Sequence, residues 1–442
     1  MASRSVHIVT LGCARNETDS EQLAGLLQAD GLSLVDAPAQ ADVVLVNTCG
    51  FIEAAKKDSI DTLLGLADLR SSNPAAKVVA VGCLAQRYQS ELASALPEVD
   101  AVLGFADYPL IGPRLRAVLD GQPEVATQPV ALATTSPQRV RLDNGPTAPL
   151  KIASGCDRRC AFCAIPGIRG SFSSRPADEI IAEARWLVDN GVKEVMLVAE
   201  DTTAYGKDRH DRDALPNLLA RLGKVDGLAW VRLSYLQPAE VTPRLLDAMA
   251  DVGNVVPYFD LSFQHASASV LRRMRRFGDA SSFLDLLAQV RSRCPQSGVR
   301  TSAIVGFPGE TEDDLTILHD FLSAARPDAI GLFAYSDEEG TLAYGMDQHI
   351  PQDIVATRLG ETADLANWVM DSRAAERVGE QVDVLVESVG KTILGRSAHQ
   401  GPEVDGSTTL DWPAEATLPS IGDIVAARVV ASDGVDLVGK PV

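Results

Sequence analysis

The sequence is short of cysteine, of aromatic side chains and of long apolar runs. Its 442 residues include 7 cysteines, and aromatic residues make up 5% of the chain. The cysteines are odd in number and clustered, a distribution that is more typical of metal binding or catalysis than of a disulfide framework. No apolar run approaches the ~18 residues needed to span a membrane. The N-terminus carries no recognisable export signal, so we expect a cytoplasmic protein without a membrane partner.

Positive charge is also scarce. The 40 Lys and Arg residues are outnumbered by 60 Asp and Glu residues, which gives a formal net charge of −20 at pH 7. Non-specific binding of nucleic acid relies on Lys and Arg that neutralise phosphates, so we do not expect nucleic acid as the direct substrate. The exception is a basic cluster, RRMRR, at residues 272–276. Such a cluster is either a solvated helix face or a contact with a partner.

Residues 1–135 alternate short apolar runs with amphipathic stretches. The strand candidates are Val6–Leu11, Asp42–Asn47, Lys77–Gly82 and Ala101–Phe105. β-Branched runs of this length, separated by helix-length segments, indicate a parallel sheet built from βαβ units. Sequence rich in Pro and Thr follows, and we interpret residues 136–149 as a linker.

Residues 150–375 repeat the alternation. Six strands are expected at residues 150–153, 194–199, 230–236, 258–263, 299–305 and 329–335, with helices at 178–190 and 312–325 among those between them. Six βα units predict a partial, TIM-type (βα)6 barrel that carries its function at the carboxyl ends of the strands. Residues 376–442 instead hold short β-like runs punctuated by Gly and Pro, which predict a small five-stranded antiparallel barrel. That segment has 5 Lys or Arg and 11 Asp or Glu, a net charge of −6.

Three cysteines, Cys156, Cys160 and Cys163, follow the first predicted barrel strand with the spacing C-x3-C-x2-C. A structural zinc site needs four ligands, and the next histidine, His210, is far away in the sequence. A cubic iron–sulfur cluster held by three thiolates keeps one iron open for S-adenosylmethionine. The segment KIASGCDRRCAFCAIPGIRG resembles the signature of the radical S-adenosylmethionine superfamily. The resemblance implies a 4Fe–4S cluster that cleaves S-adenosylmethionine to a 5′-deoxyadenosyl radical.

A second segment, TSAIVGFPGETEDD, ends the fifth predicted barrel strand with Gly306, Phe307, Pro308 and Gly309. Small residues let the backbone approach a ligand closely, and in the superfamily this turn lies beside the adenine and ribose of S-adenosylmethionine. The alternative is an ordinary βα turn that leads into a helix. We expect these four residues near S-adenosylmethionine, and we assign no catalytic residue beyond the cluster ligands.

A second set of cysteines lies in the N-terminal region. Cys13, Cys49 and Cys83 each come just after an apolar strand. Because the carboxyl ends of parallel strands share one edge of a sheet, three residues distant in sequence can converge there. The three are either small buried side chains or the ligands of one auxiliary cluster.

The segments LGCARNETDSE, NTCGFIEAAKKDSI and VGCLAQR match the N-terminal domain of the methylthiotransferases, and the acidic C-terminal region resembles their TRAM domain. The resemblance covers essentially the whole chain. It implies an α/β protein with a flavodoxin-like N-terminal domain, a radical S-adenosylmethionine core and a TRAM barrel. It also implies two 4Fe–4S clusters, one held by Cys13, Cys49 and Cys83 and the other by Cys156, Cys160 and Cys163.

Two branches of this family differ in substrate. The segments LVAEDTTAYGKD and GRSAHQGPEVDG are similar to the RimO branch, which modifies an aspartate of the small-subunit ribosomal protein uS12. An acidic barrel also suits a basic ribosomal protein better than RNA phosphates. Three positions depart from the residues usual in this branch: Ser154, Glu200 and Gln400. These departures bear on the details of the substrate, whereas all six cysteines are present.

The resemblance implies that two molecules of S-adenosylmethionine are used. One methylates sulfur carried by the auxiliary cluster, and the other provides the radical that removes a hydrogen from the β-carbon of the aspartate. A one-electron donor of the flavodoxin or ferredoxin type is expected as a partner. The alternatives are a methylthiotransferase acting on adenosine in transfer RNA, a non-catalytic iron–sulfur scaffold or electron carrier, and a nucleic-acid-binding module.

Overall fold

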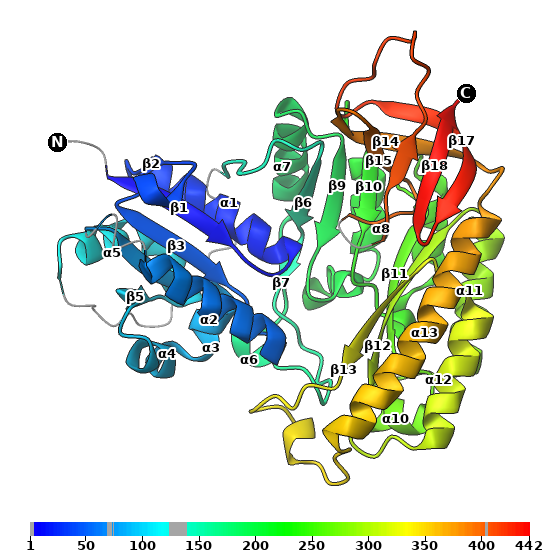
Figure 1. Cartoon of the computed structure of the whole chain (residues 1–442), viewed down its shortest axis with the longest axis horizontal. Coiled ribbons are helices and arrows are strands. Elements are labelled where there is room, and N and C mark those ends of the chain that lie inside the picture. The colour runs from blue at the N-terminus through cyan, green and yellow to red at the C-terminus, as the bar shows by residue number, and fades with distance from the viewer. Residues whose placement is uncertain (1–3, 69–72, 74, 123–138, 403–404) are drawn as a thin grey trace. The chain divides into compact units, whose positions relative to one another are not determined.

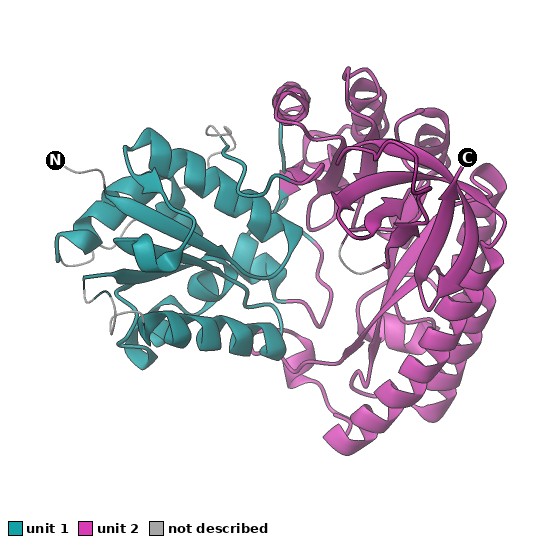
Figure 2. Ribbon diagram, turned by 45° about the horizontal axis from the view of Figure 1, so that its top comes forward, with its two compact units in different colours: residues 1–144, 154–157, 164–175 teal, residues 145–153, 158–163, 176–442 magenta. Residues whose placement is uncertain are grey.

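The computed structural model describes residues 4–68, 73, 75–122, 139–402 and 405–442. They form two compact units (Figure 2). Unit 1 contains residues 1–144, 154–157 and 164–175, and unit 2 contains residues 145–153, 158–163 and 176–442. Residues 136–138 of the predicted linker, and Glu403 and Val404 of the PEVDG segment, lie outside the described residues. Within the described residues, no helix is both long enough and apolar enough to cross a membrane.

Unit 1 contains a five-stranded parallel sheet whose order is β2-β1-β3-β4-β5 (Figure 1). This is the flavodoxin-like order. The chain adds β2 on one side of β1 and then adds β3, β4 and β5 on the other side, so the strand order reverses between β1 and β3. The strands are β1 (Ser5–Thr10), β2 (Ser33–Leu34), β3 (Val43–Thr48), β4 (Lys77–Val81) and β5 (Ala101–Val102). The helices are α1 (Ala14–Ala29), α2 (Glu53–Ala67), α3 (Gly82–Arg87), α4 (Gln89–Ala95) and α5 (Ile111–Leu119).

Successive side chains of each strand point to opposite faces of this sheet, so the strands contribute to two apolar cores. Val43 and Leu45 of β3 pack with Leu23 and Leu27 of α1 on one face. Val44 and Val46 pack on the other face with side chains that include Leu63 of α2. Because both faces are covered, β3 is buried along its whole length, as expected for a parallel sheet that reads as a continuous apolar run. The predicted N-terminal fold is confirmed.

Unit 2 contains six parallel strands that match the six expected from the sequence. They form two three-stranded sheets, β10-β9-β6 and β11-β12-β13. Isolated parallel bridges, Val231 with Val255 and Leu236 with Leu261, connect the two sheets. The strands are β6 (Thr147–Lys151), β9 (Glu194–Val198), β10 (Trp230–Leu233), β11 (Tyr258–Gln264), β12 (Gly298–Val305) and β13 (Ala329–Ala334). The helices are α7 (Ala177–Asp189), α8 (Ala214–Leu222), α9 (Pro243–Asp251), α10 (Ala268–Arg273), α11 (Ala280–Arg293), α12 (Glu312–Ala325) and α13 (Gln352–Glu376).

The first barrel strand begins earlier than its sequence pattern indicates. The apolar run starts at Leu150, but β6 begins at Thr147 and includes Pro149. Proline cannot donate a backbone hydrogen bond, so within a strand it occurs mainly where the strand lies at the edge of its sheet. β6 is such an edge strand, because it pairs only with β9 in its sheet.

The C-terminal strands form a closed barrel of order β14-β15-β16-β18-β17. The strands are β14 (Gln381–Val389), β15 (Ile393–Ser397), β16 (Thr408–Leu410), β17 (Ile424–Asp433) and β18 (Asp436–Pro441). Four pairings are antiparallel as expected, whereas β16 and β18 run parallel. The reason is geometric: strand direction cannot alternate around a closed ring with an odd number of strands, so one neighbouring pair has to be parallel.

A buried ion triad fastens this barrel to the core of unit 2. Glu194 of β9 accepts hydrogen bonds from Arg232 of β10 at 2.6 Å and from Arg396 of β15 at 2.5 Å. All three side chains are almost fully buried. Burial alone would raise the pKa of Glu194, but the two guanidinium groups more than offset it and hold that pKa below its usual value.

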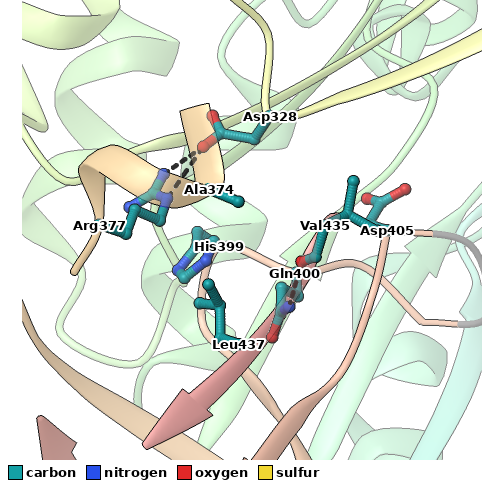
Figure 3. Close-up of a pocket in the computed structure, with 8 residues that line it drawn as sticks. All are labelled: Asp328, Ala374, Arg377, His399, Gln400, Asp405, Val435 and Leu437. Carbon is teal, nitrogen blue, oxygen red and sulfur yellow. Dashed lines mark hydrogen bonds and ion pairs between the residues drawn. The ribbon is translucent and has the colours of Figure 1, made fainter. Parts of the chain in front are cut away.

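A small cavity of about 10 Å³ lies at the same junction (Figure 3). Its lining includes Arg377, which donates to Asp328 at 2.5 Å, and His399, which is buried beside it. Burial and the neighbouring arginines hold the pKa of His399 well below its usual value, so this ring is neutral. The cavity has room for about one water molecule. It is therefore part of the junction and cannot hold S-adenosylmethionine.

Replacing Glu194 by Gln should destabilise unit 2 strongly, because two buried arginines would lose their common counter-ion. Breaking a buried ion pair costs about 3–5 kcal/mol. The measurement is urea unfolding followed by tryptophan fluorescence, to which Trp230 contributes from its contact with Leu385 of the barrel.

Glu387→Gln is the matched control, because Glu387 also accepts from Arg396, at 2.7 Å, but is partly exposed. This variant should cost about 1 kcal/mol or less. Equal losses in the two variants would show that the buried triad has no special role.

Candidate functional site

The three N-terminal cysteines lie at the carboxyl edge of the unit 1 sheet. Cys13 follows β1 and precedes α1, Cys49 follows β3, and Cys83 follows β4 in the first turn of α3. β1 and β3 flank the point where the strand order reverses, which is where sheets of this type bind their ligands. The topology therefore gathers the three thiols at one edge.

Tight backbone contacts shape this edge. Gly12 has a φ of +96°, and a Cβ there would lie 2.8 Å from the Cβ of Cys49 and 3.0 Å from its Sγ. Gly82 has a φ of +91°, and a Cβ there would lie 2.3 Å from the Oδ1 of Asn47. Both positions therefore require glycine, because an added side chain would be strained and would enter the space between the strand ends.

Arg169 is the buried cation of this edge. It lies at the end of α6 (Ile165–Arg169), after the C-x3-C-x2-C motif in the chain but within unit 1. Its guanidinium donates to the Oδ1 of Asn16 at 2.8 Å and lies 3.4 Å from the Sγ of Cys83. It also pairs with Asp19 at 2.9 Å and stacks over the ring of Phe105. The arginine thus brings a fixed positive charge to a thiol that is itself buried.

The three thiols differ in acidity. Burial would raise the pKa of Cys13, but Arg15 and Arg169 lower it more, so this pKa lies below its usual value. Burial dominates at Cys49 and Cys83 and raises the pKa of each, although Arg169 partly offsets it at both. A negative charge on Cys13 also raises the pKa of the other two thiols, so the three groups interact electrostatically.

Three thiolates are a donor set for an iron–sulfur cluster. Among the described residues, no group of three or more His, Cys, Asp or Glu side chains has the spacing to hold a single metal ion. In a cubic cluster each thiolate binds a different iron, so its ligands lie farther apart than those of a single ion. The three strand-end thiols, beside a buried arginine, supply the thiolate ligands that such a cluster takes.

The second set of cysteines lies where the chain changes units. Cys156 belongs to unit 1, where its N–H donates to the carbonyl of Gly170 at 3.0 Å. Cys160 and Cys163 belong to unit 2, and the N–H of Cys163 donates to the carbonyl of Cys160 at 3.2 Å. The short strands β7 (Ala153–Ser154) and β8 (Ser173–Ser174) flank the motif. The motif is thus a loop at the end of a barrel strand, as predicted.

A half-buried arginine contacts this loop within unit 2. The Nη1 of Arg276 lies 3.8 Å from the Sγ of Cys160, and its Nη2 donates to the carbonyl of Ser262 at the end of β11. The neighbouring N–H of Ala161 donates to the carbonyl of Met274 at 3.0 Å. The basic cluster of the sequence therefore reaches a cysteine of the motif through one of its arginines.

The glycine-rich turn after β12 packs behind the same loop. Phe307 is fully buried in a core that includes Ala161 and Met274. Gly306 and Gly309 have φ values of +82° and +80°, and a Cβ on them would collide with Val355 and with Arg273. Neighbouring protein groups thus account for both glycines, while the packing brings residues 306–309 next to the segment of Cys160.

A buried network holds this turn in place. The N–H of Gly306 donates to Glu310 at 3.0 Å, and Glu310 also accepts from Arg358 at 2.9 Å. The Nε2 of His265 lies 3.4 Å from Glu310, and its Nδ1 accepts from the N–H of Ser267 at 3.0 Å. His265 therefore supports the turn from β11, a role that its position in the sequence did not disclose.

Comparison with known proteins agrees with this architecture. Three family models match: Uncharacterized protein family UPF0004 over residues 5–104, the Radical SAM superfamily over residues 150–322 and the TRAM domain over residues 378–442. A protein of Nocardioides sp. is 55% identical over 99% of this chain and 97% of its own length. One of Cutibacterium acnes is 53% identical over 99% of this chain and 98% of its own length. Both carry the name ribosomal protein uS12 methylthiotransferase RimO.

The chain belongs to the RimO family.

Solved structures agree on the fold alone. The radical S-adenosylmethionine methyltransferase TsrM of Kitasatospora setae has a TM-score of 0.55 and 15% identity over 75% of this chain and 73% of its own. The family and the fold class expected from the sequence are therefore confirmed. As in other radical SAM proteins of this family, the cofactors are S-adenosylmethionine and 4Fe–4S clusters, of which a RimO protein has two.

The structure adds residues that the sequence reasoning missed. Arg169 was part of the quoted motif segment but was not assigned a role, because nothing in the linear sequence links it to Cys83. Asn16 bridges the strand ends, since its Nδ2 donates to the carbonyls of Leu11 and Thr48. Its place three residues after Cys13, at the start of α1, was the available signal.

In the cluster-free protein, Cys13 should react with iodoacetamide at a lower pH than Cys49, because their pKa values are shifted in opposite directions. Arg169→Gln removes a positive charge from the thiolate of Cys13, so its reaction profile should move to higher pH. Peptide mass spectrometry at a series of pH values measures both residues in one sample.

Arg116→Gln is the control, because Arg116 is an exposed arginine of the same unit that bonds to the carbonyl of Asp30. Its Cys13 profile should match that of the unmodified protein. An unchanged profile in Arg169→Gln would contradict the electrostatic role given to this arginine.

Proposed function

We propose that this chain is a radical S-adenosylmethionine methylthiotransferase that replaces a hydrogen on the β-carbon of an aspartate in ribosomal protein uS12 with a methylthio group. The observation that carries the proposal is the pair of three-cysteine sets at strand ends, in a chain that matches RimO proteins over nearly its whole length.

We assign one cluster to Cys13, Cys49 and Cys83 and the other to Cys156, Cys160 and Cys163. When bound, the second cluster supplies the electron that cleaves S-adenosylmethionine, and the first carries the sulfur to be inserted. The chain itself contributes the thiolates and one cation beside each set, the buried Arg169 and the half-buried Arg276. Arg169 lowers the pKa of all three N-terminal thiols and so favours the thiolate form that binds iron, although burial outweighs it at Cys49 and Cys83.

The turn at residues 306–309 is proposed to border S-adenosylmethionine. It packs against the segment of Cys160, and its shape is held by Glu310 and Arg358. A turn fixed in this way positions a ligand without reorganising when the ligand binds. We also propose that the domains of the chain end at residues 135 and 375, with a linker that ends at residue 149.

The charge of the C-terminal barrel supports a basic protein as the substrate. Its exposed side chains include Asp383, Asp411, Glu415, Asp423, Asp433 and Asp436. Such a surface attracts a basic ribosomal protein and repels RNA phosphates. Because uS12 is made and assembled in the cytoplasm, we place the enzyme there, with a flavodoxin- or ferredoxin-type protein as its electron donor.

Deleting the gene should lower the mass of uS12 by the difference between one SCH3 group and one hydrogen. The measurement is intact-protein mass spectrometry of ribosomal proteins from the deletion strain, with fragmentation to locate the aspartate. Transfer RNA from the same cells is the control, and its 2-methylthioadenosine content should not change. Loss from transfer RNA with unmodified uS12 mass would assign the enzyme to the other branch of the family.

Replacing Cys13, Cys49 and Cys83 together by Ala should leave about four irons per chain instead of about eight after anaerobic reconstitution, because only one of the two cubic clusters loses its ligands. The Cys294→Ala variant is the control, since Cys294 is a lone buried thiol at the end of α11. It should keep about eight irons. Full iron content in the triple variant would contradict the ligand assignment.

A further inference from the structure

The turn between α10 and α11 carries positive charge and an exposed aromatic ring in an otherwise acidic protein. We define the basic corner as residues 272–278 together with Arg159. Arg159, Arg272 and Arg275 are exposed. None of the three has an Asp or Glu partner within the part of the chain that the structure describes. In a chain with a net charge of −20, uncompensated arginines gathered at one place form a surface of opposite sign to their surroundings.

An apolar side chain stands on the same turn. Phe277 is 82% exposed and is the most exposed large apolar side chain among the described residues. A single exposed apolar residue is common, but aromatic and arginine side chains together are the residues that dominate protein–protein interfaces. The composition of the basic corner therefore favours contact with another protein over simple solvation.

The basic corner is built directly onto the cysteine loop. Its less exposed members connect the two, since Arg276 lies 3.8 Å from the Sγ of Cys160 and the carbonyl of Met274 accepts the N–H of Ala161. Turn hydrogen bonds from Arg275 to Arg272 and from Arg276 to Leu271 fix its shape. Arg159 is the immediate neighbour of Cys160 in the chain. The exposed charges thus lie on the two contacting segments that hold a residue proposed to bind the cluster that must be reduced.

The sign of the charge selects the partner. A basic ribosomal protein would be repelled here, and the acidic C-terminal barrel suits it instead. Electron transfer weakens steeply with distance, so a protein that reduces the cluster has to dock close to its ligands. An acidic carrier protein satisfies both the charge and the position, and opposite charges also speed its association.

We infer that the basic corner is the docking surface for an acidic, flavodoxin- or ferredoxin-type carrier protein that delivers one electron to the cluster proposed at Cys156, Cys160 and Cys163. The carrier loses one electron, the cluster gains one, and no atom is transferred. This inference rests on the proposed function, because it presupposes that cluster.

The test compares two electron sources in the reconstituted full-length protein. Arg272→Glu/Arg275→Glu reverses two charges of the basic corner, and Phe277→Ser removes its apolar ring. With reduced flavodoxin, kcat/KM for 5′-deoxyadenosine formation should fall about tenfold or more in the double variant. With dithionite, which needs no docking surface, each variant should keep the rate of the unmodified protein.

A matched double variant controls for net charge. Arg185→Glu/Arg212→Glu reverses two other exposed arginines of unit 2, with Arg185 on α7 and Arg212 just before α8. It should behave as the unmodified protein with both reductants. Raising the ionic strength should slow the flavodoxin reaction of the unmodified protein and of this control, but barely affect the basic-corner variant.

Three results would overturn the inference: flavodoxin rates unchanged in the basic-corner variant, equal losses with dithionite, or equal losses in the control. Binding of oxidised flavodoxin to the immobilised enzyme tests the docking surface without turnover. The basic-corner variant should not bind oxidised flavodoxin. If no protein forms 5′-deoxyadenosine even with dithionite, the proposed function fails, and the binding measurement still tests the surface. Binding of an RNA hairpin that depends on the same arginines, with flavodoxin binding intact, would assign the surface to RNA.

Discussion

Parallel strands that share a sheet end at the same edge, and the cysteine chemistry of this protein depends on that constraint. Cys13, Cys49 and Cys83 are distant in sequence, yet each directly follows a strand of one parallel sheet. The order of that sheet reverses between β1 and β3, which leaves the strand ends there uncovered by a crossover helix. The same rule places the second cysteine motif after the first strand of the barrel.

Gathering thiols at a buried edge creates an electrostatic problem that the arginines relieve. Burial raises the pKa of Cys49 and Cys83, which opposes the thiolate that iron requires. Arg169 brings a positive charge to the N-terminal set, and Arg276 brings one to Cys160. Arg169 is itself anchored by Asp19 and Asn16, so its position does not depend on the presence of a cluster.

The surface of this protein has regions of opposite charge at different places. Most of the chain is acidic, including the closed barrel that Glu194 and its two arginines hold on the core. The basic corner is the local exception, and it adjoins a cysteine loop rather than the barrel. These two surfaces of opposite sign are the ones proposed above for the basic substrate protein and for the acidic electron carrier.

The amino-acid sequence by itself determined the order of the three regions, the six barrel strands and both cysteine sets, because apolar periodicity and motif spacing are local properties of the chain. It also indicated the family, since its motifs cover the whole length. Only the tertiary structure decided which buried cations meet the thiols, because Arg169 and Cys83 are far apart in sequence and meet through folding. The same holds for the parallel pair β16 and β18, which ring closure imposes, and for Pro149, which becomes acceptable in a strand only because β6 lies at a sheet edge.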